Sequence, residues 1–137
     1  MGMSEVRRGS ARGFTLIELM IVIVIVAVLL GIALPAYQKQ ILRGHRAAAK
    51  AEIMEIANRQ VQYLLANRTY TADPNDFAYT LPDDVAARYD FTVTVSASSA
   101  PYFLISAAPK GSQLKDGSEA LTLDSQGEKL PEDKWAR

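Results

Sequence analysis

The stretch Gly13-Phe14-Thr15-Leu16-Ile17-Glu18 decides how this chain is built, because a basic leader ends there and a long apolar run begins. From Leu19 to Ala36 the sequence holds only Leu, Met, Ile, Val, Ala, Gly and Pro. At about 1.5 Å per residue, a helix over residues 14–36 reaches roughly 34 Å, enough to cross a bilayer core of about 30 Å. We therefore expect one transmembrane helix over residues 14–36.

A buried core helix is the alternative for a segment that is apolar on all sides. A chain of 137 residues offers too little surrounding protein to cover such a helix completely. The leader carries Arg7, Arg8 and Arg12 against Glu5 alone, and short flanks rich in Arg stay in the cytoplasm. We therefore expect the C-terminal bulk to lie outside the inner membrane.

The apolar segment is expected to be retained in the mature protein. A secretory signal would place a small-residue cleavage site after the apolar stretch, but residues 35–38 run directly into more helix. If anything is removed, the abrupt change in polarity favours cleavage of the Gly13–Phe14 bond.

The presence of Glu18 in an apolar segment requires an explanation, because a carboxylate costs on the order of 2.5 to 3.5 kcal/mol at the bilayer centre. Cleavage after Gly13 would create an α-amino group at Phe14, with which Glu18 could pair on the same or a neighbouring chain. Glu18 could equally lie in the headgroup zone and be hydrated. On physical grounds the two possibilities are equal.

The segment Arg12-Gly13-Phe14-Thr15-Leu16-Ile17-Glu18-Leu19, followed by the apolar run, resembles the class III signal of type IV pilins and pseudopilins. The resemblance implies that a prepilin peptidase cuts after Gly13 and methylates the new N-terminus at Phe14. Glu18 falls at the fifth mature position, where this family uses a glutamate to pair with the N-terminus of an adjacent subunit. The resemblance therefore favours an assembly role for Glu18.

The tail resembles that of minor pilins of the type IV pilus, a group that includes a DNA-uptake receptor; the resemblance rests on Gln113, Asp116, the stretch 121–127 and Trp135. In that group a disulfide commonly closes the C-terminal region. This chain has no cysteine, and Ser118 and Lys134 stand where the resemblance would place those cysteines. We expect packing of Trp135 onto the sheet to compensate.

Beyond Pro35 the helix is predicted to continue as an amphipathic half, because apolar or weakly polar residues recur at spacings of three or four. Gly31 and Pro35 mark the expected kink, since proline lacks an amide hydrogen. The helix is expected to end near Ala66–Asn67. The predicted stripe consists of Ile41, Leu42, His45, Ala49, Ile53, Ile56, Gln60, Tyr63 and Leu64.

Three later runs, 89–95, 102–107 and 120–124, are typical of β-strands, and the links between them suit a meander. The loop before them is rich in turn formers, and its aromatic residues Tyr70, Phe77 and Tyr79 are expected to pin it onto the sheet. The predicted fold is α+β: a long N-terminal helix packed on an antiparallel sheet of 3–4 strands, the pilin fold. The expected organisation is a leader (1–13), a transmembrane half (14–36) and a globular head (37–137).

No pattern of enzyme chemistry is present in the sequence. His45 is the single histidine, so it is expected to be a packed or surface residue rather than a metal ligand. Glu52, Glu55 and Arg59 are assigned to a solvated helix face. Six C-terminal carboxylates lack the spacing of a calcium loop, so neither a metal nor another cofactor is expected; they are Asp116, Glu119, Asp124, Glu128, Glu132 and Asp133.

The charge balance argues against general DNA binding. The chain holds 15 basic and 15 acidic residues, and removal of the leader's three Arg and one Glu leaves 12 basic and 14 acidic. Arg43, Arg46 and Lys50 are expected to face solvent or neighbouring subunits, and nucleic acid is not an expected partner.

The sequence therefore predicts a minor pilin of a type IV pilus, anchored in the bacterial inner membrane by a single pass and then displayed on the pilus at the cell surface. The partners implied by the resemblance are prepilin peptidase, other pilins in a homo- or hetero-oligomeric filament, the inner-membrane assembly platform and the bilayer. The alternatives are a pseudopilin of a type II secretion system and a pilus-displayed DNA-uptake receptor.

Overall fold

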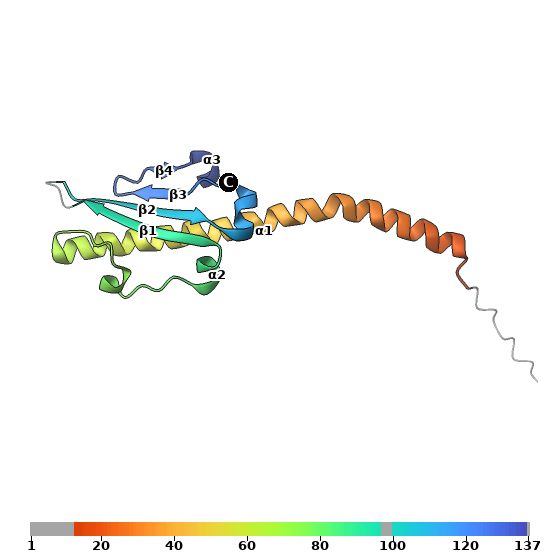
Figure 1. Cartoon of the computed structure of the whole chain (residues 1–137), viewed down its shortest axis with the longest axis horizontal. Coiled ribbons are helices and arrows are strands. Elements are labelled where there is room, and N and C mark those ends of the chain that lie inside the picture. Colours follow the sequence, from red (N-terminus) through yellow and green to blue (C-terminus); the bar gives the residue numbers. More distant parts are fainter. Residues whose placement is uncertain (1–12, 97–99, 137) are drawn as a thin grey trace, which may run out of the picture. The chain divides into compact units, whose positions relative to one another are not determined.

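The computed structural model describes residues 13–96 and 100–136 (Figure 1). The leader prediction for residues 1–12, including its three arginines and Glu5, lies outside the described residues. The chain divides into two compact units, residues 1–37 and residues 38–137. The second unit is called the head below.

Helix α1 covers Leu16–Asn67 and remains helical through Pro35. Its first turn is capped by Thr15, whose Oγ1 accepts a hydrogen bond from the Glu18 amide at 3.2 Å. Thr15 and Glu18 have the spacing of a capping box, so this local pattern favours a helix start at Leu16. The helix ends at Asn67 as predicted, where Arg68 takes a left-handed conformation with φ of 61°.

The head has one apolar core between α1 and the sheet. Ala49, Ile53 and Ile56 of α1 are at most 2% exposed, and this confirms the centre of the predicted stripe. Two positions differ from the prediction. Ile41 is 40% exposed, whereas Arg46 is only 6% exposed, because a carboxylate from a distant segment reaches its guanidinium.

The sheet is an antiparallel meander with the order β1-β2-β3-β4, in which consecutive strands are neighbours. The strands are β1 (Tyr89–Ser96), β2 (Tyr102–Pro109), β3 (Leu121–Asp124) and β4 (Lys129–Leu130). Val93 pairs with Ile105, and Ile105 with Leu123, so apolar residues lie side by side on the face toward α1 (Figure 1). Phe91, Val93 and Val95 share that face and pack against the core.

The segment between α1 and β1 is pinned to the head, as expected for its aromatic residues. It contains the 3-10 helix η1 (Pro74–Phe77) and the short helix α2 (Asp83–Ala86). Tyr70, Phe77 and Tyr79 are half-buried against the core, and the Tyr70 ring meets the Phe103 ring edge-on at 4.8 Å. The loop is therefore packed against the head over much of its length.

Polar groups of α1 strengthen this attachment. The fully buried Gln60 amide bonds both backbone groups of Thr71, at 2.5 and 3.2 Å. The Tyr79 hydroxyl donates to Glu52 at 2.6 Å, and Arg59 donates to the Phe77 carbonyl at 2.9 Å. Glu52 and Arg59 were predicted to belong to a solvated face; both are half-buried, because their partners come from the loop.

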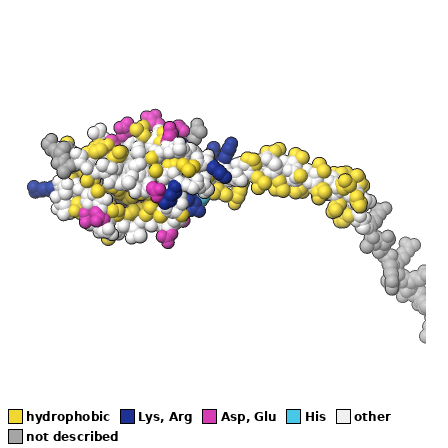
Figure 2. Space-filling view, in the orientation of Figure 1, with side chains coloured by type: hydrophobic (Ala, Val, Ile, Leu, Met, Phe, Trp, Pro, Cys, Tyr) yellow, Lys and Arg dark blue, Asp and Glu magenta, His cyan; other side chains and the backbone are white. Residues whose placement is uncertain are grey.

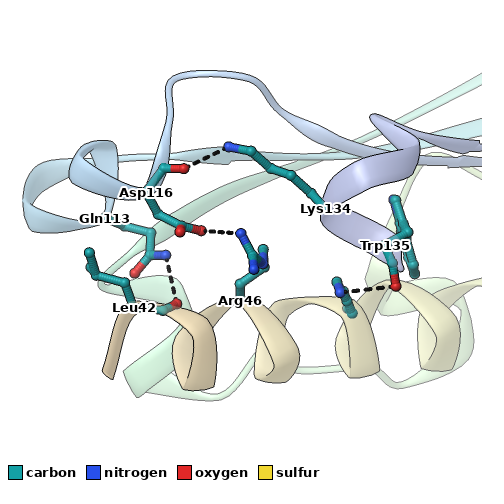
Figure 3. A network of polar contacts seen from close by, with 7 residues as sticks. Leu42, Arg46, Gln113, Asp116, Lys134 and Trp135 are labelled. Carbon is teal, nitrogen blue, oxygen red and sulfur yellow. Dashed lines mark hydrogen bonds and ion pairs between the residues drawn. The ribbon is translucent and has the colours of Figure 1, made fainter. Parts of the chain in front are cut away.

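The link between β2 and β3 contains the 3-10 helix η2 (Gly111–Asp116), and the chain ends in helix α3 (Glu132–Trp135). Trp135 packs against the core, as predicted, and its indole N–H donates to the Leu130 carbonyl at 3.2 Å. Both segments lie at the same end of the head (Figure 3). The segment η2 contacts α1 through the Asp116 side chain, and α3 contacts it through the Trp135 carbonyl.

Candidate assembly site

The first unit presents an apolar surface with no protein cover of its own. Every described residue from Gly13 to Gln40 is exposed, and the apolar side chains cover this part of α1 in Figure 2. Among the described residues, helix α1 is long and apolar enough to cross a membrane. None of its most apolar 18-residue segment is buried. Such a surface requires either lipid or other protein around it.

Glu18 is the single charged side chain between Gly13 and Gln38. Its carboxylate is exposed, and among the described residues no side chain or backbone donor bonds it. The Thr15 cap engages the Glu18 backbone amide only. The Glu18 carboxylate therefore lies on an apolar helix and makes no hydrogen bond or ion pair with the described residues.

The Gly13–Phe14 bond lies in non-helical chain just before α1, and Phe14 is 85% exposed. Within the described residues, nothing lies within 4 Å of where a Gly13 Cβ would stand. Gly31 and Pro35 lie inside α1, far from either of its ends. Cleavage, methylation and a kink at these positions stay predictions.

At the head, Asp116 lies at the centre of a polar network that links α1, η2 and α3, because it contacts both Arg46 and Lys134 (Figure 3). The Arg46 guanidinium contacts the Asp116 carboxylate of η2 at 2.8 Å, and the two side chains are 7% and 17% exposed. The fully buried Gln113 donates to the Leu42 carbonyl at 3.0 Å. The prediction that Arg46 faces solvent or a neighbouring subunit is therefore wrong.

Lys134 joins the C-terminal helix to η2 in the same network. Its ammonium donates to the Asp116 carbonyl at 2.8 Å and lies against Gly117, where a side chain would collide with it. Gly117 also has a positive φ of 126°, which favours glycine. Of the two positions that the resemblance assigns to cysteines, Ser118 and Lys134, only Lys134 takes part in this contact, and its partner is Asp116.

Burial shifts the pKa of three groups in the head, of which Tyr89 and Lys50 lie beside this network. Burial raises the pKa of Tyr89 to about 12, with the Asp116 charge adding to the effect. Burial, followed by repulsion from Arg46, lowers the pKa of Lys50, whose ammonium donates to the Trp135 carbonyl at 3.2 Å. Burial and the hydrogen bond to Glu52 raise the pKa of Tyr79. All three groups hold structural contacts.

The C-terminal carboxylates do not converge. In the part of the chain that the structure describes, no group of three or more His, Cys, Asp or Glu is placed to hold a metal ion. Asp124 instead accepts the amides of Gln126 and Glu128 at 2.9 Å and closes the turn before β4. His45 is half-buried, and its Nδ1 has no partner among the described residues.

Comparison with protein families places these features in a known context. Residues 35–122 match the family described as "Type IV minor pilin ComP, DNA uptake sequence receptor", and residues 8–34 match the prokaryotic N-terminal methylation motif. The chain belongs to the type IV pilin family. This pilin has the α+β architecture predicted from its sequence, and it is a structural subunit rather than an enzyme.

Individual relatives agree with this assignment. The pilin is 34% identical over 120 residues to the fimbrial protein EcpC of Eikenella corrodens, covering 85% of this chain and 74% of the relative. It is 31% identical over 96 residues to the type IV wide pilus major component PilA4 of Thermus thermophilus, with 70% and 72% covered. A match to the type IV major pilin protein PilA of Myxococcus xanthus, also 31% identical over 86 residues, covers 63% of this chain and 38% of that relative.

Sequence reasoning missed the buried contacts of the head, although it had singled out several of their members. The sequence analysis singled out Gln113 and Asp116 without placing either against the helix, and the structure pairs both with α1. The i,i+4 pair of Glu55 and Arg59 was visible in the sequence, but its backbone partners in the loop were not.

Proposed function

We propose that this chain is a minor pilin of a type IV pilus, processed after Gly13 and incorporated into the filament through its N-terminal helix. The observation that carries the proposal is the uncovered apolar helix with one unpaired carboxylate, Glu18, near its start. Lipid satisfies the apolar surface before assembly, and neighbouring pilin helices satisfy it afterwards. Transfer between the two environments then need not expose it to water.

Processing and assembly are coupled through the new N-terminus. Removal of residues 1–13 by a prepilin peptidase leaves a positive, methylated amine at Phe14, in the same apolar setting as Glu18. An unpaired carboxylate is costly there, whereas a carboxylate paired with a neighbour's amine is offset by the attraction between them. Glu18 therefore fixes the axial position at which an incoming subunit fits, with the assembly platform of the inner membrane adding the subunits.

Glu18→Ala and Glu18→Gln test this role directly in cells that make the pilus. We expect both variants to insert and be cleaved like the wild type, and to fall at least about tenfold in the sheared surface fraction. Glu119→Gln is the matched control, because Glu119 is an exposed carboxylate of the head with no bond among the described residues. Incorporation of Glu18→Ala at the wild-type level would remove the basis for the assembly role.

The family match supports a second candidate, a DNA receptor displayed on the pilus, because the matching description names a DNA uptake sequence receptor. The 12 basic and 14 acidic residues after the leader provide no general attraction for DNA, so such binding would need a local contact surface. Fluorescence anisotropy of labelled duplex DNA with the full chain in detergent, at moderate salt, tests this candidate. The pseudopilin alternative predicts a processed chain confined to membranes.

A further inference from the structure

A pocket of about 310 Å³ lies on the head, where the first turns of α1 in this unit meet η2 and α3. Its lining holds five cationic side chains and two carboxylates. The cations are Lys39, Arg43, Arg46, Lys115 and Lys134, and the carboxylates are Asp116 and Asp133. In Figure 2, Lys and Arg side chains gather at the end of the head where α1 enters it.

Most of this positive charge is not neutralised within the described residues. Asp116 is already engaged by Arg46, at 2.8 Å. Lys39, Arg43 and Lys115 are exposed, and no described carboxylate lies within ion-pair distance of them. The pocket is therefore a local cationic site on a chain that carries no net charge.

Arg46 lines the same pocket. Its side chain is 7% exposed, yet its Nε–H has no acceptor among the described residues. A buried donor without a partner is unfavourable unless a ligand or water satisfies it. An anion in the pocket would supply acceptor oxygens to the exposed cations Lys39, Arg43 and Lys115.

The length of chain between the pocket and the predicted transmembrane segment limits how far the pocket can lie from the bilayer. Lys39 follows Ala36 by three residues, which span at most about 11 Å even in extended chain. The cations that α1 contributes therefore start within reach of the headgroup layer when residues 14–36 span the bilayer. That layer presents phosphate groups at high local concentration, whereas DNA has to arrive from solution.

We propose that this pocket binds the phosphate of an anionic phospholipid headgroup while the subunit resides in the membrane. The inference rests on membrane residence in the proposed function and adds a ligand class to it. Lys and Arg near an anionic surface each contribute on the order of 1 kcal/mol, so Arg43 and Lys115 together strengthen binding about thirty-fold. The lipid holds the subunit until assembly carries the pocket away from the bilayer.

The test is native mass spectrometry of the full-length chain in a non-ionic detergent, with equal amounts of dioleoylphosphatidylglycerol and dioleoylphosphatidylcholine. We expect the wild type to retain the phosphatidylglycerol preferentially, and Arg43→Gln/Lys115→Gln to lose about thirty-fold in its affinity. Both side chains are exposed and unpaired among the described residues, so the fold should persist, as an unchanged melting temperature would verify. The control is Arg68→Gln/Lys110→Gln, which removes the same number of cations outside the pocket, one of them paired with the exposed Asp90.

Equal retention of the two lipids by the wild type, or equal loss in both double variants, would overturn the proposal. Parallel titrations with inorganic phosphate and with duplex DNA distinguish the source of the phosphate. If either ligand binds in a manner dependent on Arg43 and Lys115 while the lipid preference is absent, the pocket belongs to that ligand and the lipid proposal fails. The chain is unassembled throughout, so normal incorporation of Glu18→Ala would refute the assembly role without affecting this result.

Discussion

Replacement of Asp116 by alanine should destabilise the head strongly, because it leaves the Arg46 guanidinium buried without its carboxylate. The two side chains are 7% and 17% exposed, and their charged atoms are 2.8 Å apart. Loss of one partner from a buried pair typically costs 3 to 5 kcal/mol. Since Asp116 is partly exposed, water can reach the site, and we expect about 3 kcal/mol.

Arg46→Met should cost less, about 1 to 2 kcal/mol, because the remaining Asp116 carboxylate can turn toward water and the methionine keeps much of the buried volume. The double variant Arg46→Met/Asp116→Ala should then lose at least about 1 kcal/mol less than the sum of the single variants. This coupling separates the ion pair from simple loss of packing.

The assay is thermal denaturation of the full-length chain in detergent, followed by the fluorescence of Trp135, the single tryptophan. For a head of this size, 3 kcal/mol corresponds to a decrease in Tm of about 12 °C or more. Asp90→Ala is the matched control. Asp90 pairs with Lys110 at 2.6 Å, but the side chains are 68% and 40% exposed, so its loss should cost under about 1 kcal/mol. If Asp116→Ala destabilises no more than Asp90→Ala, burial does not govern the pair and the reasoning is refuted.

Two further predictions concern the same end of the head. Trp135→Ala should lower the melting temperature in circular dichroism, because the ring packs on the core and its indole bonds Leu130; an unchanged melting temperature would refute this contribution. Stability should also fall between pH 10 and about pH 12, because the pKa of Tyr89 is raised from 10.0 to about 12 in the folded state. The stabilisation from the raised pKa is fully present below the pKa of the unfolded state and is lost as the pH rises through the pKa of the folded state. For Tyr89 this lowers the free energy of unfolding by about 2 to 3 kcal/mol. Urea denaturation at a series of pH values gives the free energy of unfolding against pH. Tyr89→Phe should flatten this curve between pH 10 and about pH 12, and an identical slope in the two proteins would contradict the assignment.

The helix and most of its buried stripe could be predicted, because both follow from periodicity within a continuous segment. Ala49, Ile53 and Ile56 recur at helical spacing, and the structure buries all three. Arg46 could not be placed in the same way. Its partner Asp116 is 70 residues away, so no local pattern shows that the guanidinium is neutralised.

The strands too could be predicted only where the sequence holds a local pattern. The runs that became β1, β2 and β3 have strong β propensity, whereas Lys129–Leu130 is too short to produce a pattern. Strand β4 exists because Leu123 and Thr122 of β3 offer partners for it. Polarity alone singled out Glu18 and the Gly13–Phe14 bond, since Glu18 interrupts a run of apolar side chains, whereas their assigned roles came from the family resemblance.

The central claim is that this chain is processed after Gly13 and incorporated into a pilus. Intact-mass and N-terminal analysis of the protein from sheared surface filaments, beside membranes of the same cells, tests it most directly. The account predicts a chain that begins at methylated Phe14 in the sheared fraction. A processed chain confined to the membranes would contradict pilus incorporation, and an uncut chain that begins at Met1 would contradict the processing itself.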